Sequence, residues 1–184
     1  IPLLAHADPA DLLILSGGAG GIINEVLKHP TVQRIVYAEL DPKIMELLRK
    51  YPTPLTEHEL SDLRLEVSHI DGRRLLQTTE QTYDVIMVGI DEPADLQSNR
   101  FFTHEFFQLA SQGLTDVGIL VFSLPGSLTY LSGELRNLNA SVRHTLQDVF
   151  PHVRVIPGEG SHLFLASRDE GIISMDIDRF ARGT

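Results

Sequence analysis

The segment 16–21, which reads SGGAGG, constrains the fold of this chain more than any other stretch. It follows the apolar run 11–15 and precedes the segment 22–29, which ends at Pro30. A short apolar run that leads into glycines predicts a buried strand, and the stretch before Pro30 predicts a helix over 20–29. A strand, a glycine turn and a helix in this order indicate a ligand site beyond the end of the strand.

The rest of the chain alternates between strands and helices. Further strands are expected at 34–39, 63–67, 83–88, 117–124, 153–156 and 162–167. Further helices are expected at 41–50, 71–76, 101–114 and 133–150. Residues 51–61 contain two prolines and are expected to form a loop. With the last two strands as an antiparallel pair, the alternation predicts an α/β fold with a mainly parallel, seven-stranded sheet flanked by helices.

The composition excludes several classes of function. The 184 residues contain no cysteine, which removes disulfides and thiolate metal sites, and the eight histidines lack metal-binding spacing, so we expect no metal. A formal net charge of −10 argues against a nucleic-acid partner. Because the sequence shows neither the ~20 apolar residues of a membrane helix nor the pattern of a signal peptide, the expected location is cytoplasmic.

Gly18 and Gly20 bear on the class of cofactor. They match the first two glycines of the dinucleotide fingerprint G-x-G-x-x-G, but the third position is Ile23. A pyrophosphate must approach the helix N-terminus closely, so this departure disfavours NAD. S-adenosylmethionine and its relatives have no pyrophosphate and tolerate a looser turn, so the pattern favours them over a dinucleotide. In the alternative interpretation, the glycines only form a tight connection.

Acidic residues follow two of the expected strands. Glu39 lies 21 residues after Gly18, at the end of the second strand, where a carboxylate can bind the hydroxyl pair of a ribose. Asp71, which Gly72 follows, comes after the third strand, where an acidic residue can face an adenine base. In the alternative interpretation, Glu39 is a solvated strand end and Asp71 only caps the next helix.

The chain resembles the spermidine synthase, or aminopropyltransferase, family from its first residues to near its end. The stretches that carry the resemblance are PLLAH at 2–6, SGGAGG at 16–21, EVLKHP at 25–30, ELD at 39–41, DG at 71–72, YDVIMV at 83–88 and NRFFTHEFF at 99–107. Leu96 and Gln97, before Asn99 and Arg100, are most similar to bacterial members in which the synthase-like domain is joined to a membrane-embedded part.

The resemblance implies a transferase with a Rossmann-like fold, that of class I S-adenosylmethionine-dependent methyltransferases. Members of the family bind decarboxylated S-adenosylmethionine and move its aminopropyl group to a diamine such as putrescine, which releases methylthioadenosine. The nucleoside site that the resemblance implies consists of Gly17, Gly18, Ala19, Gly20, Glu39, Asp71, Gly72 and Gly89.

The resemblance also bears on what surrounds residues 1–184. The apolar start at 1–5 has no initiator methionine, and the amino-terminal β-domain of the family is absent. We therefore expect a single synthase-like domain that is a piece of a longer chain. The resemblance allows a membrane-embedded segment in that parent chain, with this domain on the cytoplasmic side, and it allows a homodimer.

The chain lacks two aspartates of the family pattern, and Glu92 takes the place of a third. Family members read G-G-G-D-G-G at the turn, where Ala19 replaces the Asp that helps to hold the aminopropyl end of the cofactor. They also read D-x-x-D-P after the fourth strand, where Gly89 replaces the Asp that deprotonates the attacking amine. An amine with a pKa near ~10 must lose a proton before it attacks, so a carboxylate is the expected base. Asp91 and Glu92 are the candidates, with Asp95 beyond them.

Two other functions stay open at this point. The absence of an Asp at position 19 makes room for the carboxylate of intact S-adenosylmethionine, the cofactor of a methyltransferase. The absence of an Asp at position 89 fits a non-catalytic domain that binds a nucleoside or a polyamine. In that case Asp91 and Glu92 only cap a loop of turn residues. Cofactor preference and turnover separate the three hypotheses.

Overall fold

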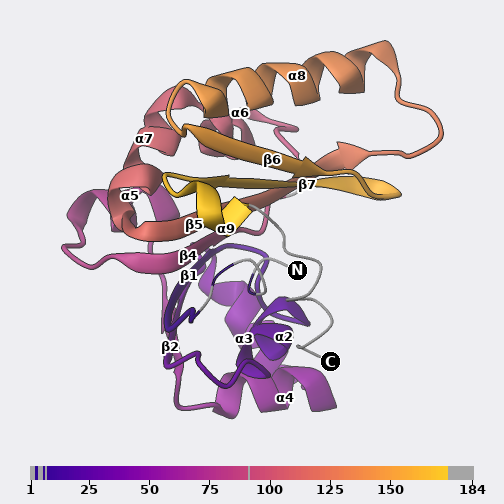
Figure 1. Ribbon diagram of the computed structural model, residues 1–184. Helices are drawn as coiled ribbons and strands as arrows, with labels where there is room; N and C mark the ends of the chain where they lie inside the picture. The colour runs from indigo at the N-terminus through magenta and orange to yellow at the C-terminus, as the bar shows by residue number, and fades with distance from the viewer. Residues whose placement is uncertain (1–2, 4–5, 7, 91, 174–184) are drawn as a thin grey trace.

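A sheet of seven strands runs through the protein, and its spatial order is β3-β2-β1-β4-β5-β7-β6 (Figure 1). The computed structural model describes residues 3, 6, 8–90 and 92–173. In chain order, β1 to β7 are Asp11–Leu15, Arg34–Ala38, Leu65–Ser68, Tyr83–Val88, Leu114–Gly126, His152–Ile156 and Gly160–Ser167. The strands β1 to β5 pair in parallel, whereas β7 pairs antiparallel with β5 and β6. The strand order reverses between β1 and β4, and this reversal is the topological switch point of the sheet.

Helices connect the strands. Between β1 and β3 lie α2 (Ile22–Leu27), α3 (Pro42–Lys50) and α4 (Pro54–Ser61). After β3 come α5 (Gly72–Thr78), α6 (Leu96–Asn99), a 3-10 helix (Arg100–Phe102), α7 (His104–Gly113), α8 (Gly133–Gln147) and α9 (Glu170–Ile173). Within the described part of the chain, no helix combines the length and the apolar character needed to cross a membrane.

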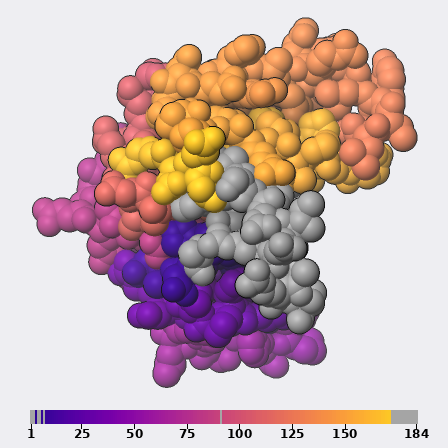
Figure 2. All heavy atoms as spheres, in the orientation of Figure 1, coloured from indigo at the N-terminus to yellow at the C-terminus, as the bar shows by residue number. Residues whose placement is uncertain are grey.

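The two faces of the sheet bury two separate apolar clusters, because side chains alternate along each strand. On β1, Leu13 and Leu15 belong to the cluster that α5, α7 and α8 cover, whereas Leu12 and Ile14 belong to the cluster under α2 and α3. All four side chains are fully buried. Figures 1 and 2 show the same division from outside, with α7 and α8 above and α2 to α4 below. Helices therefore cover both faces of the sheet.

The structure confirms the predicted α/β class and the seven strands, but it corrects the interpretation of residues 51–61 as a loop. This segment contains α4, which starts at Pro54, where a helix does not need an N–H donor. The Thr53 hydroxyl accepts a hydrogen bond from the Thr56 backbone N–H, and the Thr56 hydroxyl accepts one from the Thr53 N–H. A proline that was interpreted as a breaker therefore begins a capped helix.

Several boundaries also differ from the prediction. The strand β3 begins at Leu65 instead of residue 63, because its pairing with β2 begins there. The strand β5 runs from Leu114 to Gly126, beyond the predicted 117–124, because Leu114 pairs with Tyr83 of β4 and because β7 pairs with β5 as far as Gly126. The single helix expected at 101–114 is divided at Thr103, whose side chain caps α7. The strands β1 and β4 end at the predicted residues, and β2 and β3 end one residue away from them.

Candidate nucleoside-binding site

A cavity of about 270 Å³ lies at the carboxyl ends of the parallel strands, beside the switch point. It is lined by Ser16, Glu39, Leu40, Asp41, Asp71, Gly72, Ile90, Asp95, Gln97, Ser98, Arg100 and Phe101. The first six come from the segments that follow β1, β2 and β3, and the others from the segment between β4 and α7. Four residues that the sequence singled out, Glu39, Asp71, Gly72 and Asp95, therefore share one cavity.

The turn after β1 lies against the end of β4 so closely that neither Gly17 nor Gly89 has room for a side chain. A Cβ atom on Gly17 would lie 2.1 Å from the Gly89 carbonyl oxygen, and a Cβ atom on Gly89 would lie 2.2 Å from the Ser16 carbonyl oxygen. Gly17 also has a φ of 61°, in the region that favours glycine. Gly17 therefore packs directly against Gly89, the residue that follows β4. In the family pattern, position 89 is the Asp that deprotonates the attacking amine.

Glu39 is the most buried acidic group of the cavity, with 5% of its surface exposed. Its Oε2 accepts a hydrogen bond from the Tyr37 hydroxyl at 2.8 Å, and its Oε1 accepts one from the Asp41 backbone N–H at 3.2 Å. A carboxylate offers about four acceptor positions, so Glu39 keeps capacity for the hydroxyls of a ribose. The alternative interpretation, a solvated strand end, does not fit this burial.

Tyr37 links Glu39 to the glycine turn. Its ring lies under Gly18, where a Cβ atom would approach the ring to 3.2 Å. Burial, followed by the hydrogen bond to Glu39 and its negative charge, raises the pKa of Tyr37 well above the usual value, and backbone hydrogen bonds from Ala19 and Gly18 oppose this shift. The hydroxyl therefore stays protonated and donates to Glu39. Sequence analysis did not single out Tyr37, although its position two residues before Glu39 places both side chains on one face of β2.

Asp71 has two roles, because its two carboxylate oxygens have different partners. Its Oδ1 accepts hydrogen bonds at 3.1 Å from the backbone N–H groups of Arg73 and Arg74, which caps α5. Its Oδ2 forms an ion pair with the Arg100 guanidinium. The cap that was considered as an alternative is therefore present, and the same residue also lines the cavity.

Among the described residues that line the cavity, Arg100 is the one basic residue. Its Nε donates to the Gln97 carbonyl oxygen at 3.0 Å, and its guanidinium lies 5.1 Å from the centre of the Phe101 ring. Arg73 donates to the Arg100 carbonyl oxygen at 2.8 Å, which joins α5 to the 3-10 helix. Arg100 belongs to the stretch that carries the family resemblance, but sequence reasoning assigned it no role in the site.

The lining is acidic on balance. In the part of the lining that the structure describes, there are four carboxylates, those of Glu39, Asp41, Asp71 and Asp95, and one guanidinium, that of Arg100. Hydrogen bonds from the backbone N–H and hydroxyl of Ser98 hold the pKa of Asp95 below its usual value, so this carboxylate is ionised near neutral pH. The cavity therefore favours a ligand that carries positive charge.

The glycine turn has a further acidic partner that sequence analysis missed. Glu59, on α4, is completely buried. Its Oε2 accepts a hydrogen bond from the Gly20 N–H at 2.8 Å, and its Oε1 accepts from the N–H groups of Gly21 and Asn24 at 2.8 and 2.9 Å. Because residues 51–61 were expected to form a loop, no sequence signal brought Glu59 to the turn.

The other predicted site residues that the structure describes are not among those that line the cavity. Ala19 packs against the apolar cluster under α2. Glu92 is exposed and does not line the cavity, and Asp91 lies outside the described residues. Of the three acids that the sequence proposed as the base, Asp91 therefore stays a prediction, and Asp95 is the one that lines the cavity. Among the described residues, no three His, Asp or Glu side chains are grouped as ligands of a metal ion.

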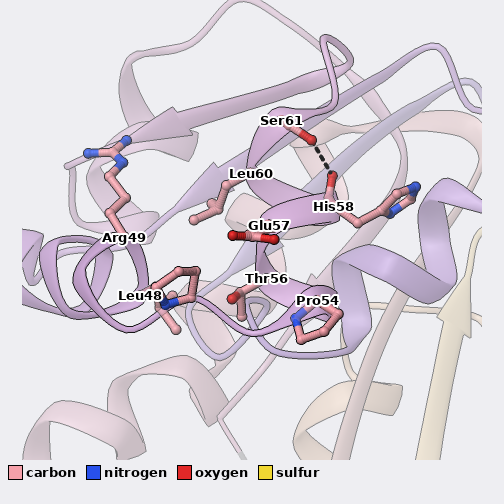
Figure 3. A pocket seen from close by; sticks show the side chains of 9 residues that line it. Leu48, Arg49, Pro54, Thr56, Glu57, His58, Leu60 and Ser61 are labelled. Carbon is pink, nitrogen blue, oxygen red and sulfur yellow. Dashed lines mark hydrogen bonds between the residues drawn. The ribbon is translucent and has the colours of Figure 1, made fainter.

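A second, larger hollow of about 630 Å³ lies between α3 and α4 (Figure 3). Its lining comes from those two helices and the segment that joins them, and it includes Leu48, Arg49, Pro54 and His58. No strand end contributes to it, and it shares no lining residue with the smaller cavity. The candidate site is therefore the smaller cavity at the switch point.

The strand order and the place of the cavity define the class of this protein, a Rossmann-like domain with the fold of class I methyltransferases. Residues 1–168 match the family described as the spermine/spermidine synthase domain. The chain belongs to this family.

Two curated relatives illustrate the match. The polyamine aminopropyltransferase of Bacillus mycoides (strain KBAB4) is 40% identical over 121 residues, which cover 66% of this chain and 43% of that protein. The polyamine aminopropyltransferase of Ruegeria sp. (strain TM1040) is 31% identical over 172 residues, which cover 88% of this chain and 60% of that protein. The chain thus spans less than two thirds of the length of these relatives.

Solved structures give the same fold. A spermidine synthase in complex with the transition-state analogue AdoDATO superposes with a TM-score of 0.78 at 27% identity, over 98% of this chain and 62% of that chain. Human methyltransferase-like protein 13 in complex with SAH superposes with a TM-score of 0.71 at 21% identity, over 98% and 84% of the two chains. The second likeness concerns the fold alone.

Proposed function

We propose that the cavity beside the glycine turn binds decarboxylated S-adenosylmethionine and its product methylthioadenosine, as a step in aminopropyl transfer to a diamine such as putrescine. The observation that carries the proposal is the buried Glu39 carboxylate at the end of β2, oriented by Tyr37 and open to the cavity. In the proposed complex, Glu39 binds the ribose hydroxyls, and Asp71 and Gly72 lie on the side of the adenine.

Charge supports this ligand. Decarboxylated S-adenosylmethionine carries a sulfonium and an amine and has no carboxylate, and a diamine is also cationic near neutral pH. The four carboxylates of the cavity lining favour such groups. The spermidine synthase in complex with the transition-state analogue AdoDATO, a structural relative of this chain, also supports a ligand of this kind.

The transfer itself needs a base. The amine nitrogen attacks the carbon bonded to the sulfonium, a C–N bond forms, and the C–S bond breaks with its electron pair retained by methylthioadenosine. The proton lost by the amine passes to a carboxylate. Gly89 cannot supply one, so we assign this proton to Asp91, two residues further along the chain, with Asp95 of the cavity lining as the second candidate.

Calorimetric titration with methylthioadenosine, decarboxylated S-adenosylmethionine, S-adenosylmethionine and NAD tests the proposal. We expect binding of the first two and none of NAD, followed by putrescine-dependent release of methylthioadenosine in a turnover assay. If none of the four ligands binds, the proposal is wrong. Binding without turnover assigns the chain to non-catalytic binding of a nucleoside or polyamine.

A methyltransferase is the second candidate, and Ala19 is the observation that favours it. Without an Asp at this position, the turn does not repel the carboxylate of intact S-adenosylmethionine. Preference for intact over decarboxylated S-adenosylmethionine in the same titration supports this candidate. The homodimer, the cytoplasmic location and a membrane-embedded segment in the parent chain stay predictions.

A further inference from the structure

Glu59 is a buried carboxylate whose partners all belong to the glycine turn and the start of α2. It comes from a different helix, 35 or more residues along the chain, and bonds the backbone N–H groups of Gly20, Gly21 and Asn24. Hydrogen bonds to an ionised acceptor are about twice as strong as neutral ones. Three of them at one fully buried group fix the position of the turn relative to α4.

The bonded N–H groups are those that a phosphate would use. The first N–H groups of a helix have no partner within the helix, and in dinucleotide-binding folds they bind the pyrophosphate. Here Gly21 caps α2 without a side-chain hydrogen bond, and Glu59 supplies the missing acceptor. The N–H groups of Ile23 and Glu25 are bonded to the carbonyl oxygens of Gly18 and Gly21.

We propose that Glu59 is a positioning and specificity residue: it holds the glycine turn for a nucleoside and prevents a phosphate from binding there. The inference rests on the proposed function, because it concerns the ligand of the same site. A phosphate at the turn would lack donors and would meet a buried negative charge. A sulfonium ligand carries the opposite charge and needs none of these donors.

Titration of three variants with methylthioadenosine and with ADP tests the inference. ADP has an adenosine like that of methylthioadenosine and carries phosphates where the latter has a thioether. Glu59→Gln keeps the size of the side chain and removes its charge. Glu59→Asp keeps the charge and shortens the reach. Glu57→Gln, at an exposed position of the same helix, is the matched control.

We expect wild-type protein to bind methylthioadenosine and to reject ADP. Glu59→Gln should weaken methylthioadenosine binding by about tenfold and reduce the preference over ADP by about tenfold. Glu59→Asp should weaken methylthioadenosine binding and still reject ADP, since the negative charge remains. Glu57→Gln should behave as wild type. Amide NMR signals of Gly20, Gly21 and Asn24 should shift in both Glu59 variants before any ligand is added.

The outcomes separate this inference from the function on which it rests. If wild-type protein binds methylthioadenosine and Glu59→Gln has the same ratio of affinities, Glu59 is only structural and the inference is wrong. Increased ADP binding by Glu59→Asp also contradicts it. If wild-type protein binds neither ligand, the proposed function fails, and the selectivity assigned to Glu59 fails with it. Should Glu59→Gln not fold, the Glu59→Asp titration decides alone.

Discussion

At the scale of single residues, Tyr37 and Glu39 form the most constrained pair of the site. The hydroxyl of Tyr37 donates to Glu39, and its ring lies under Gly18, so one side chain sets both the carboxylate and the turn. The spacing from Gly18 was enough to predict a role for Glu39 from the sequence. The roles of Tyr37 and Glu59 were not predicted, because they depend on which backbone atoms lie beside these residues in the fold, and no local sequence pattern encodes this.

Replacement of Glu39 by Ala should weaken methylthioadenosine binding by about 1–3 kcal/mol, the effect of a lost charge-assisted hydrogen bond. Calorimetry measures the loss, and a thermal unfolding curve confirms that the fold is intact. Glu46→Ala, at an exposed position of α3, is the control. Unchanged affinity in a folded Glu39→Ala protein would remove Glu39 from the site.

Replacement of Tyr37 by Phe should weaken the same binding by about 0.5–1.5 kcal/mol, because Glu39 loses a donor while the ring under Gly18 is kept. The pKa of Tyr37 is raised, so the hydroxyl is protonated on both sides of neutrality, and the effect should be the same at pH 6 and pH 9. A Tyr37→Phe protein with wild-type affinity would show that Glu39 does not depend on this hydrogen bond.

Replacement of Gly89 by Ala should destabilise the protein by about 1–3 kcal/mol, because the new methyl group meets the Ser16 carbonyl oxygen. Denaturant unfolding measures this. Gly133→Ala is the control, since no atom lies within 4 Å of a Cβ atom there. If Gly89→Ala is as stable as Gly133→Ala, the turn can move away from a side chain at position 89. The turn would then also tolerate an Asp at this position.

At the scale of elements, α4 is a helix that the sequence pattern did not predict. The prolines at 52 and 54 indicated a loop, yet Thr53 and Thr56 form a capping box around Pro54. The strands were easier to predict, since apolar runs such as 83–88 are buried and have one compatible place in the sheet. Glu59 lies on α4, so the wrong prediction of a loop at 51–61 also left this residue out of the predicted site.

The end of α4 should make stability depend on pH. Hydrogen bonds from Arg64 lower the pKa of Asp62 to about 2, and Arg64 also donates to the Leu27 carbonyl oxygen of α2. The pKa of Asp62 in the folded protein is therefore below its ordinary value of 3.8. Its contribution to stability is complete above that value and is lost as the pH falls toward about 2.

Denaturant unfolding between pH 5 and pH 2 tests this linkage. The free energy of unfolding of wild-type protein should fall more steeply than that of Asp62→Asn, which lacks the titrating group. Glu46→Gln, at an exposed position of α3, should follow wild type. Parallel curves for Asp62→Asn and wild type would contradict the assignment.

At the scale of the whole molecule, the sheet consists of two groups of strands, β1 to β3 on one side and β4 to β7 on the other. The groups meet between β1 and β4, and the cavity lies at this boundary. The alternation of strands and helices was enough to predict this architecture, because a covered parallel sheet has few solutions. In the cavity lining from 95 to 101, Asp95 was a predicted candidate, but the other residues were not, since the place of this segment depends on the Asp71–Arg100 ion pair across the fold.

The acidic character of the molecule should distinguish its ligands by their salt dependence. With a formal net charge of −10 and four carboxylates in the cavity lining, binding of cationic decarboxylated S-adenosylmethionine should weaken several-fold as ionic strength rises from about 0.02 to about 0.5 M. Binding of uncharged methylthioadenosine should hardly change. Equal salt dependence of the two ligands, measured by calorimetry, would show that charge does not select the ligand.

The contact between Gly17 and Gly89 also limits how this sequence can change over time. A side chain at either position meets the backbone of the other segment, so neither glycine can be replaced by itself without loss of stability. An acidic residue at position 89 therefore becomes tolerable only after the turn at 16–17 has shifted. Mutational paths that lead to the family pattern must therefore change the turn before the acid or together with it.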